Sequence, residues 1–424
     1  MSGRYDLVLY GVTGFTGAYV LEVFAKSSNF GKVKLAVAGR NESKIRSVLK
    51  EVSNFAKVDV TNLPIIIADS GNEKSLGEMA KQAKVIVNVV GPYRLYGEAV
   101  VKAAVENGAS HVDISGEPAF LEKMQQKYGK QAKENGVYVV GACGWDSIPC
   151  DLGVNFLKQN FDGTLEYAET FVHVKNGPSG YSFNAGTYQT LILGIWQAKN
   201  DGLGKIRKEI MPQKLERSPF RPKKRGNLWW NETLECYSLP FPGSDRSVVQ
   251  RSQYFDATEN NARPVNIETY MLIKSKFWAL ALMLWVALLS VFVQFGFTRK
   301  LLQKYPDVCS FYMFKNEGPS RQQAKEASFT YWIFGKGWGN NEKAGEKAPE
   351  KTKVARCDGP DAGYIGTSGC VLASALTILQ DKDKLPEEGG VFTTTAAFKE
   401  TKIYDRLREF GVTFRVDDSV RANL

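Results

Sequence analysis

The feature that most constrains the fold of this chain is a glycine-rich turn near the N-terminus, set between a short apolar segment and a helix-like one. Residues 5–10 read Tyr-Asp-Leu-Val-Leu-Tyr, the turn carries Gly11, Gly14 and Gly17, and a second apolar run follows at 33–38. A strand, a glycine turn, a helix and a second strand in this order form the unit that holds a dinucleotide. The sequence therefore predicts that the diphosphate of such a cofactor lies at the positive end of the helix dipole.

Each glycine has its own expected role. Gly11 allows the tight turn off the strand, Gly14 lets the backbone approach the pyrophosphate, and Gly17 lets the helix lie close to the sheet. The residues expected to bind the cofactor combine this turn with the ends of later strands: Gly11, Thr13, Gly14, Phe15, Thr16, Gly17, Arg40, Lys44, Asp69, Gly91 and Pro92.

The residue after the second strand favours NADP over NAD. An NAD site usually carries Asp or Glu there, because a carboxylate accepts a hydrogen bond from the ribose 2′-hydroxyl. This chain has Arg40 instead, with Lys44 and Arg46 close behind. A guanidinium suits a 2′-phosphate, which it can contact through two hydrogen bonds. NAD stays open as the alternative, since Arg40 could equally be a solvated loop residue.

Composition places the chain among globular proteins of more than one domain. Its 424 residues exceed one typical domain, and its hydrophobic fraction of 43% and charged fraction of 24% are ordinary. The six cysteines are scattered and only two histidines are present, so we predict neither a disulfide framework nor a structural metal site. The first strand begins within a few residues of Met1, which leaves no room for a signal peptide and predicts a cytosol-facing protein.

Strand and helix signals alternate through the first 140 residues. After the opening unit we expect helices over 42–52, 74–82, 98–107 and 118–134, and strands over 63–68, 85–90, 112–114 and 137–140. Six strands alternating with helices predict a doubly wound parallel α/β sheet, with the ligand at its carboxyl edge.

From about residue 148 the pattern changes. Residues 166–174 and 265–273 alternate apolar and polar side chains as half-buried antiparallel strands do, so an α+β domain is expected. We also expect helices over 187–199, 367–380 and 403–410, a strand over 412–416, and a mobile loop over the polar, glycine-rich residues 336–353.

A 21-residue apolar run, Phe277 to Phe297, is interrupted only by Ser290, Gln294 and Gly296. As one helix it would be about 30 Å long, enough to cross the hydrocarbon core of a bilayer. Basic residues flank both ends, which predicts a segment that enters and leaves a lipid surface on one side, as a bent hairpin or an in-plane helix. The predicted partner is a lipid monolayer, such as that of a lipid droplet, or the cytosolic face of a membrane. A buried core helix and a spanning helix remain alternatives.

The net charge of +10 is unevenly distributed. A basic run extends from Lys205 to Arg225 and is followed by Trp229 and Trp230. Attraction to an anionic lipid surface, with the tryptophans at headgroup depth, is one interpretation, and a solvated loop is the other. Nucleic acid is not predicted, because no module that reads it is recognisable. A small-molecule substrate is expected, and homodimerisation is left open.

The motifs of this chain resemble those of the saccharopine dehydrogenase-like oxidoreductases. Besides the glycine turn, they are Ala-Val-Ala-Gly-Arg at 36–40, Asn-Val-Val-Gly-Pro-Tyr at 88–93, Asp-Ile-Ser-Gly-Glu at 113–117, Gly-Trp-Asp-Ser-Ile-Pro at 144–149 and Gly-Gly-Val-Phe-Thr at 389–393. The resemblance implies a Rossmann domain over 1–147, an inserted α+β domain over 148–360 that contains the apolar segment, and a C-terminal return to the first domain over 361–424. It does not imply saccharopine as substrate, because a long apolar insertion has no evident use for a polar amino-acid conjugate.

Hydride transfer requires a proton source near the reacting carbon. The catalytic candidates at the strand ends are Tyr93, Tyr96, Glu117, Asp146 and Ser147. Either tyrosine could donate to a carbonyl oxygen, and either carboxylate could orient an amine or exchange a proton. Each has a structural alternative: a helix cap near residue 148 for Asp146 and Ser147, a turn over the nicotinamide for Tyr93, and a helix start for Glu117.

The expected function is hydride transfer to a lipophilic carbonyl or imine by an NADP-dependent oxidoreductase at a lipid surface. Two alternatives stay open, a non-catalytic nucleotide-binding scaffold and a soluble saccharopine reductase-like enzyme.

Overall fold

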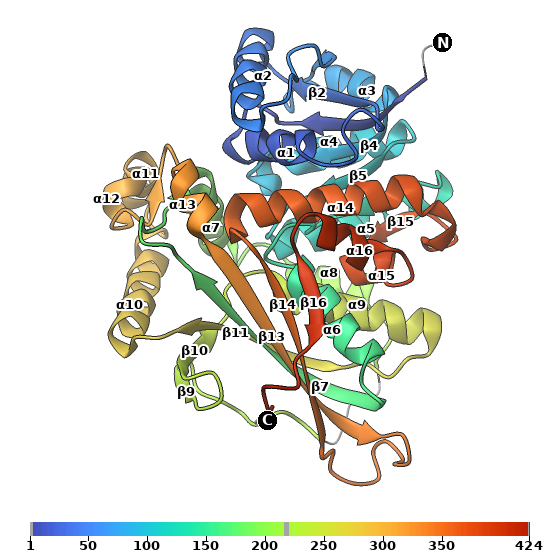
Figure 1. Ribbon diagram of the computed structural model, residues 1–424, viewed down its shortest axis with the longest axis vertical. Helices are drawn as coiled ribbons and strands as arrows, with labels where there is room; N and C mark the ends of the chain where they lie inside the picture. The colour runs from blue at the N-terminus through green and yellow to red at the C-terminus, as the bar shows by residue number, and fades with distance from the viewer. Residues whose placement is uncertain (1–2, 216–219, 423) are drawn as a thin grey trace.

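Two seven-stranded sheets form the framework of the protein, and a long helix, α14 (Thr367–Gln380), runs between them (Figure 1). The computed structural model describes residues 3–215, 220–422 and 424. The first sheet lies at the top of the view in blue and cyan, and the second lies below it in green, yellow and orange.

The first sheet is parallel throughout, with the strand order β15-β6-β5-β4-β1-β2-β3. Its strands are β1 (Tyr5–Tyr10), β2 (Leu35–Gly39), β3 (Ile65–Ile67), β4 (Ala83–Asn88), β5 (Ser110–Asp113), β6 (Tyr138–Val140) and β15 (Gly390–Phe392). The order reverses at β1, which is the topological switch point of a dinucleotide-binding fold. The predicted doubly wound α/β fold is confirmed.

Helices cover both faces of this sheet. They are α1 (Phe15–Ala25), α2 (Glu42–Ala56), α3 (Glu73–Lys81), α4 (Tyr93–Glu106) and α5 (Pro118–Glu134). Leu7 and Leu9 of β1 face a core shared with α1, α2 and α14, and Val8 and Tyr10 face the core beneath α3 and α4. Both sides of β1 are therefore buried, as parallel sheets require.

The C-terminal segment returns to the first sheet, as the resemblance implies. β15 pairs with β6 in parallel, so residues from the end of the chain supply its outermost strand. The same segment also carries β16 (Thr413–Val416), which pairs with the second sheet. The proposed domain boundaries at 147 and 360 stay a prediction.

The second sheet is mixed, with the order β16-β14-β13-β7-β11-β10-β9. Its other strands are β7 (Gly163–Lys175), β9 (Trp229–Asn231), β10 (Cys236–Pro240), β11 (Asn266–Ile273), β13 (Ser328–Gly339) and β14 (Lys351–Pro360). The expectation that 166–174 and 265–273 are half-buried antiparallel strands is wrong in two respects, although β7 is antiparallel to β13 and β11 is antiparallel to β10. β7 and β11 lie side by side in parallel, and residues 165–172 of β7 are buried without alternation.

The expected mobile loop over 336–353 is also partly wrong. β13 continues to Gly339 and β14 begins at Lys351, so only 340–350 form the connection. Gly337 is needed inside β13, because a Cβ atom there would lie 2.0 Å from the carbonyl oxygen of Thr164. The glycines of this segment therefore permit close strand contact rather than mobility.

Helices of the second half complete the fold. They are α6 (Ile148–Gln159), α7 (Ala185–Gln197), α8 (Leu203–Ile210), α9 (Asp245–Asn260), α13 (Arg321–Glu326), α15 (Thr394–Phe398) and α16 (Ile403–Glu409). The short strands β8 (Phe183–Asn184) and β12 (Phe314–Lys315) form a separate pair. Buried residues of α6 and of both sheets belong to one continuous core, which joins the two halves of the molecule.

The apolar run does not form one helix. It divides into α10 (Lys276–Phe292) and α11 (Gly296–Lys304), and a short helix α12 (Pro306–Cys309) follows. The buried-core alternative fails, because within α10 only Ala279 and Leu289 are fully buried, whereas ten large apolar side chains of the run stay exposed: Phe277, Trp278, Leu280, Leu284, Val286, Leu288, Val291, Phe292, Phe295 and Phe297. At 17 residues α10 is about 26 Å long, shorter than a spanning helix needs.

A different helix passes the length and composition test for a membrane span. Among the described residues this is Ala362–Gln380, and 83% of its apolar window is buried inside the protein. It includes α14, whose side chains contact β4 and β5. Its apolarity therefore belongs to the core.

Some basic side chains of the run Lys205 to Arg225 form ion pairs within the protein. Arg207 forms an ion pair with Glu122, and Arg225 forms one with the buried Glu169 while its guanidinium lies 3.8 Å from the ring centroid of Trp229. Residues 216–219 of this run lie outside the described part of the chain.

Candidate functional site

The turn after β1 has the geometry that a dinucleotide requires. Gly11 has a φ of +98°, a backbone conformation that is strained for any residue with a side chain. A Cβ atom at Gly17 would lie 2.2 Å from the carbonyl oxygen of Gly11, so a larger residue would push α1 away from the turn. A Cβ atom at Gly14 would lie 3.3 Å from the same oxygen, and Gly14 itself is exposed at the N-cap of α1.

The N-terminus of α1 offers unpaired hydrogen-bond donors. No side chain caps it, and among the described residues no acceptor binds the backbone N–H groups of Phe15, Thr16 and Gly17. Free amides at the positive end of a helix dipole fit a diphosphate. The side chain of Phe15 packs against the protein, with its ring centroid 4.7 Å from that of Tyr364, so only the backbone N–H of this residue is offered to the diphosphate.

The ends of β2 and β3 fit the phosphorylated adenosine half of NADP. Gly39, the last residue of β2, pairs with Ile67, the last residue of β3. Arg40 therefore leaves β2 next to the exposed side chain of Ile67. Arg40 and Lys44 are exposed, and Glu42 is engaged by Arg46 at 2.6 Å. Asp69 accepts from the N–H of Gly71 at 2.8 Å and so shapes its own loop. Arg40 and Lys44 supply two exposed cations at this tip, and the nearby carboxylates of Glu42 and Asp69 are each bound by a neighbouring group, which suits a 2′-phosphate.

Tyr93 is a structural residue. The helix α4 begins at Tyr93, five residues earlier than expected, so Gly91 and Pro92 lie just before its first turn. The Tyr93 hydroxyl donates to the carbonyl oxygen of Asn88 at 2.9 Å, and burial raises the pKa of this hydroxyl well above its usual range. Tyr96, on the same helix, is 42% exposed.

Glu117 binds the start of α4 rather than the open crevice. Its carboxylate accepts from the N–H of Tyr93 at 2.8 Å and from Nε of Arg94 at 2.9 Å. Arg94 also donates to Gln197 at 2.6 Å and to Asp201 at 3.0 Å, beyond the end of α7. Glu117 and Arg94 therefore tie the first sheet's α4 to the chain segment after α7. Sequence reasoning missed Arg94, because its partners are more than 20 positions away.

Asp146 and Ser147 follow β6 at the same edge of the sheet. Ser147 is the N-cap residue of α6, as its structural alternative proposed, but its hydroxyl lies 2.9 Å from that of Ser244 and does not cap the helix. Asp146 is half-buried, and its Oδ2 lies so near Gly116 that a Cβ atom there would come within 2.2 Å. Desolvation raises the pKa of Asp146 to about 6.

Two further buried carboxyls lie near Asp146 and were not among the candidates. Asp245, at the start of α9, accepts from the hydroxyl of Tyr331 at 3.1 Å, and burial raises its pKa well above the usual range. Its second oxygen and the indole N–H of Trp145 are buried with no partner among the described residues. The residues around Asp245 in the sequence gave no sign that its carboxyl lies near Asp146. Only the fold brings the start of α9 next to the start of α6, where Ser244 contacts Ser147.

Asp113 is the other missed carboxyl, although it begins one of the quoted motifs. Its Oδ1 accepts from the N–H groups of Ser115 and Ala142 at 2.9 and 3.1 Å. Desolvation raises its pKa to about 7, and the nearby charges of Glu117 and Asp146 act in the same direction. His111, 3.7 Å away, is neutral, since burial lowers its pKa to about 3.

Replacing Asp113 by asparagine is expected to raise stability at neutral pH. The folded chain holds a proton on Asp113 up to about pH 7, whereas the unfolded chain releases it near pH 4, so stability falls as the pH rises through this window. Asparagine keeps the Oδ1 acceptor and has no charge to desolvate. The gain in Tm over the wild type should therefore be larger at pH 7.5 than at pH 4.5. Asp59→Asn is the control, because hydrogen bonds from Thr61 lower the pKa of this exposed carboxylate. Equal gains for Asp113→Asn at both pH values would contradict the assignment.

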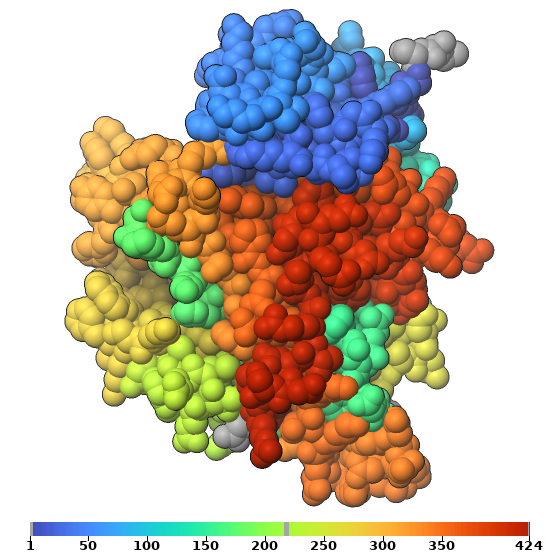
Figure 2. Space-filling model, in the orientation of Figure 1, coloured from blue at the N-terminus to red at the C-terminus, as the bar shows by residue number. Residues whose placement is uncertain are grey.

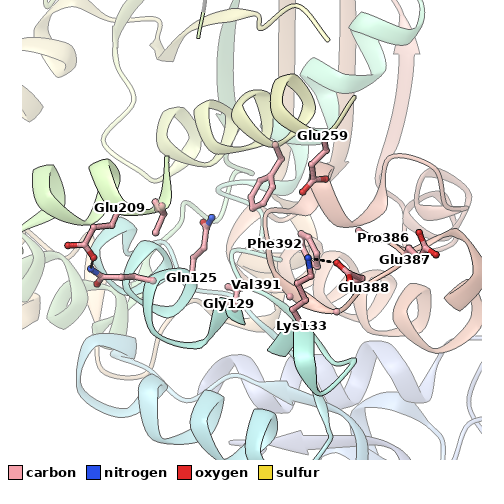
Figure 3. A pocket seen from close by; sticks show the side chains of 15 residues that line it. Gln125, Gly129, Lys133, Glu209, Glu259, Pro386, Glu387, Glu388, Val391 and Phe392 are labelled. Carbon is pink, nitrogen blue, oxygen red and sulfur yellow. Dashed lines mark hydrogen bonds and ion pairs between the residues drawn. The ribbon is translucent and has the colours of Figure 1, made fainter. Parts of the chain in front are cut away.

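A groove of about 500 Å³ lies away from these residues, between α5, α9 and β15 (Figure 3). Glu209, Glu259 and Glu388 project around it, and Lys133 forms an ion pair with Glu388. None of the predicted site residues lines it.

The sheet order, the glycine turn and the basic end of β2 define a dinucleotide-binding protein of the Rossmann type whose site suits NADP. Residues 7–140 match the saccharopine dehydrogenase NADP binding domain. A Caenorhabditis elegans protein named lipid droplet localized protein is 58% identical, and a human saccharopine dehydrogenase-like oxidoreductase is 39% identical, each over 98% of both chains. The chain therefore belongs to the saccharopine dehydrogenase-like oxidoreductase family.

A solved structure has the same fold over nearly the whole chain. Apo saccharopine dehydrogenase (L-Glu forming) from Saccharomyces cerevisiae aligns with a TM-score of 0.53 over 97% of this chain and 100% of that one, at 11% identity. At this identity the match shows the fold alone.

Proposed function

We propose that this protein is an NADP-dependent oxidoreductase that works at a lipid surface, on a lipid droplet or the cytosolic face of a membrane, and reduces a lipophilic carbonyl or imine. The observation that carries the proposal is the exposed apolar face of α10 on the same chain as the dinucleotide fold. A water-facing helix with so many large apolar side chains is rare in soluble monomers and is typical of membrane contact.

Three further observations support attachment to a lipid surface, and the first of them supports attachment from one side. α10 ends before Gly296 and the chain turns into α11, so both ends of the apolar run return to the same protein body (Figure 1). The C. elegans relative is named for lipid droplets. The exposed Trp230 supports headgroup contact as well. In the sheet, Trp230 of β9 lies opposite Tyr237 of β10, and Tyr237 lies opposite Ile273 at the end of β11, just before α10 begins.

NADPH would supply the hydride, held by the amides at the start of α1 and by Arg40 and Lys44. We assign the proton to Asp146. Of the five candidates, Tyr93, Glu117 and Ser147 are fully buried and engaged in hydrogen bonds to the fold, and Tyr96 projects outward. Asp146 is partly accessible, lies at the carboxyl edge of the sheet and has a pKa of about 6, which suits proton exchange near neutral pH.

Replacing Asp146 by asparagine is expected to lower turnover about 100-fold or more with little change in NADPH affinity, because a positioned acid contributes a factor of this order. Purified protein is incubated with NADPH deuterated at C4 and a lipid extract, and mass spectrometry follows deuterium into lipid products. Ser147→Ala is the matched control and should keep its turnover. A variant Asp146→Asn with normal turnover would remove Asp146 from the mechanism.

A non-catalytic nucleotide-binding scaffold is the second candidate function. It is favoured by the structural use of Tyr93, Glu117 and Ser147, which leaves few acid–base groups at the crevice. The same experiment separates the two functions. NADPH binding without deuterium in any lipid would support the scaffold.

A further inference from the structure

The loop after α12 presents two aromatic side chains to solvent from a strained backbone. Phe311 and Tyr312 have φ values of +51° and +62°, in the left-handed region that bulky residues rarely adopt. Their side chains are 78% and 60% exposed, so no core contact compensates for the strain. Such outliers indicate a function when the fold holds them in place and they serve no internal contact.

The fold does hold this loop firmly. The N–H of Tyr312 donates to the carbonyl oxygen of Asp307 at 2.7 Å, and the N–H of Phe314 donates to the hydroxyl of the buried Ser310 at 2.9 Å. The indole of Trp285 on α10 donates to the carbonyl oxygen of Cys309 at 3.1 Å. The loop is therefore fastened to α10. Its backbone is already ordered before the two aromatic side chains contact a partner, which lowers the entropic cost of binding.

This loop lies on the same side of the molecule as α10. α10, α11 and α12 occupy one edge of the ribbon in Figure 1, in yellow and orange, and the same colours form one flank of Figure 2. Beyond residue 297, further large apolar side chains are exposed on or next to α11 and α12: Leu301, Tyr305 and Val308. The apolar surface is thus larger than the run that the sequence pointed to.

The charge of this flank selects its partner. Residues 274–316 contain six basic side chains and one acidic one, Asp307. Lys300 and Lys304 are exposed among the apolar residues, and Lys315 lies 5.9 Å from the ring centroid of Tyr312. An apolar surface surrounded by cations is complementary to anionic phospholipids. A second copy of this chain would bring the same cations together and repel itself.

We propose that Phe311 and Tyr312 form a second, rigid insertion point into an anionic phospholipid surface, so that the protein lies on the lipid along the whole α10–α12 flank. The inference rests on the lipid attachment in the proposed function and extends it beyond residues 277–297. Two separate contacts on one flank, α10 and the loop after α12, fix the orientation of the protein on the surface, which a single helix does not.

The test is the double variant Phe311→Gly/Tyr312→Gly, compared with the wild type by flotation with phosphatidylcholine–phosphatidylserine vesicles. Binding should weaken about tenfold or more, because two large apolar side chains are lost from the contact. Tm should stay the same or rise, because glycine adopts positive φ without strain. Asn261→Gly is the control, since Asn261 has a φ of +51° outside this flank and its replacement should leave vesicle binding unchanged.

The outcomes separate this inference from the proposed attachment. If the wild type binds and Leu284→Glu on α10 does not, while the loop variant binds normally, the loop has no lipid contact and the inference is wrong. If the wild type itself does not float with vesicles, the attachment fails as well. A lipid-free dimer that dissociates in the loop variant, measured by analytical ultracentrifugation, would identify a second copy as the partner and overturn the proposal.

Discussion

Replacing Gly14 by aspartate is expected to abolish NADPH binding while leaving the protein folded. Gly14 caps α1, and its Cβ position lies 3.3 Å from the carbonyl oxygen of Gly11, so a side chain requires only a small local adjustment. The added carboxylate, however, would occupy the place where the free amides of Phe15 and Thr16 await a diphosphate. It would satisfy those amides itself and repel the ligand. Affinity should fall at least about 100-fold, since both attraction and space are lost.

The measurement is a fluorescence titration with NADPH, together with the Tm of each protein. Gly204→Asp is the matched control, because Gly204 is exposed at the beginning of α8 and a Cβ atom there meets nothing within 4 Å. This control should bind NADPH as the wild type does. Unchanged affinity in Gly14→Asp would show that the cofactor does not use this turn.

The opening unit could be predicted from the sequence because its signals are local. The strand, the turn and the first helix occupy consecutive residues, and the need for Gly11 and Gly17 follows from backbone sterics within that turn. The helix Thr367–Gln380 was predicted with its observed limits for the same reason, since neither a charged residue nor a proline interrupts it.

Strand partners in the second sheet could not be predicted. The alternating pattern of 166–174 predicted one buried face, whereas residues 165–172 are all buried, and the partners of β7 are β13 and β11, which lie about 100 or more positions later. Whether such a neighbour runs parallel depends on the connection between the two strands, and the connection from β7 to β11 includes three helices, α7, α8 and α9.

The roles of the candidate acids were beyond the sequence for a related reason. Glu117 and Tyr93 lie at strand ends, as predicted, yet each is bound by a group more than four positions away, on α4 or β4. A carboxyl or phenol group at a sheet edge indicates that a proton donor or acceptor is present there. Whether a hydrogen bond from the fold already uses that chemistry depends on the tertiary structure.

Replacing Arg94 by methionine is expected to destabilise the protein by about 3–5 kcal/mol, the usual cost of leaving a buried charge without its partner. The side chains of Arg94 and Glu117 are only 10% and 3% exposed, so water cannot solvate the remaining carboxylate. Asp201 would lose its partner as well, and with it the tie between α4 and the end of α7. Urea unfolding measures this loss as a lower midpoint. The control is Lys81→Met, at an ion pair whose side chains are 57% and 58% exposed, and it should change the free energy of unfolding by less than about 1 kcal/mol.

The double variant Arg94→Met/Glu117→Gln decides whether the buried charge is the cause. Glutamine keeps an acceptor for the N–H of Tyr93, 2.8 Å from Glu117 in the wild type, and brings no charge to desolvate. The double variant should therefore be more stable than Arg94→Met alone, although the contacts to Gln197 and Asp201 stay broken. If the double variant is as unstable as the single one, the loss comes from the broken link to α7 and not from the unpaired carboxylate. If Arg94→Met is no less stable than Lys81→Met, the cluster does not hold the two halves together.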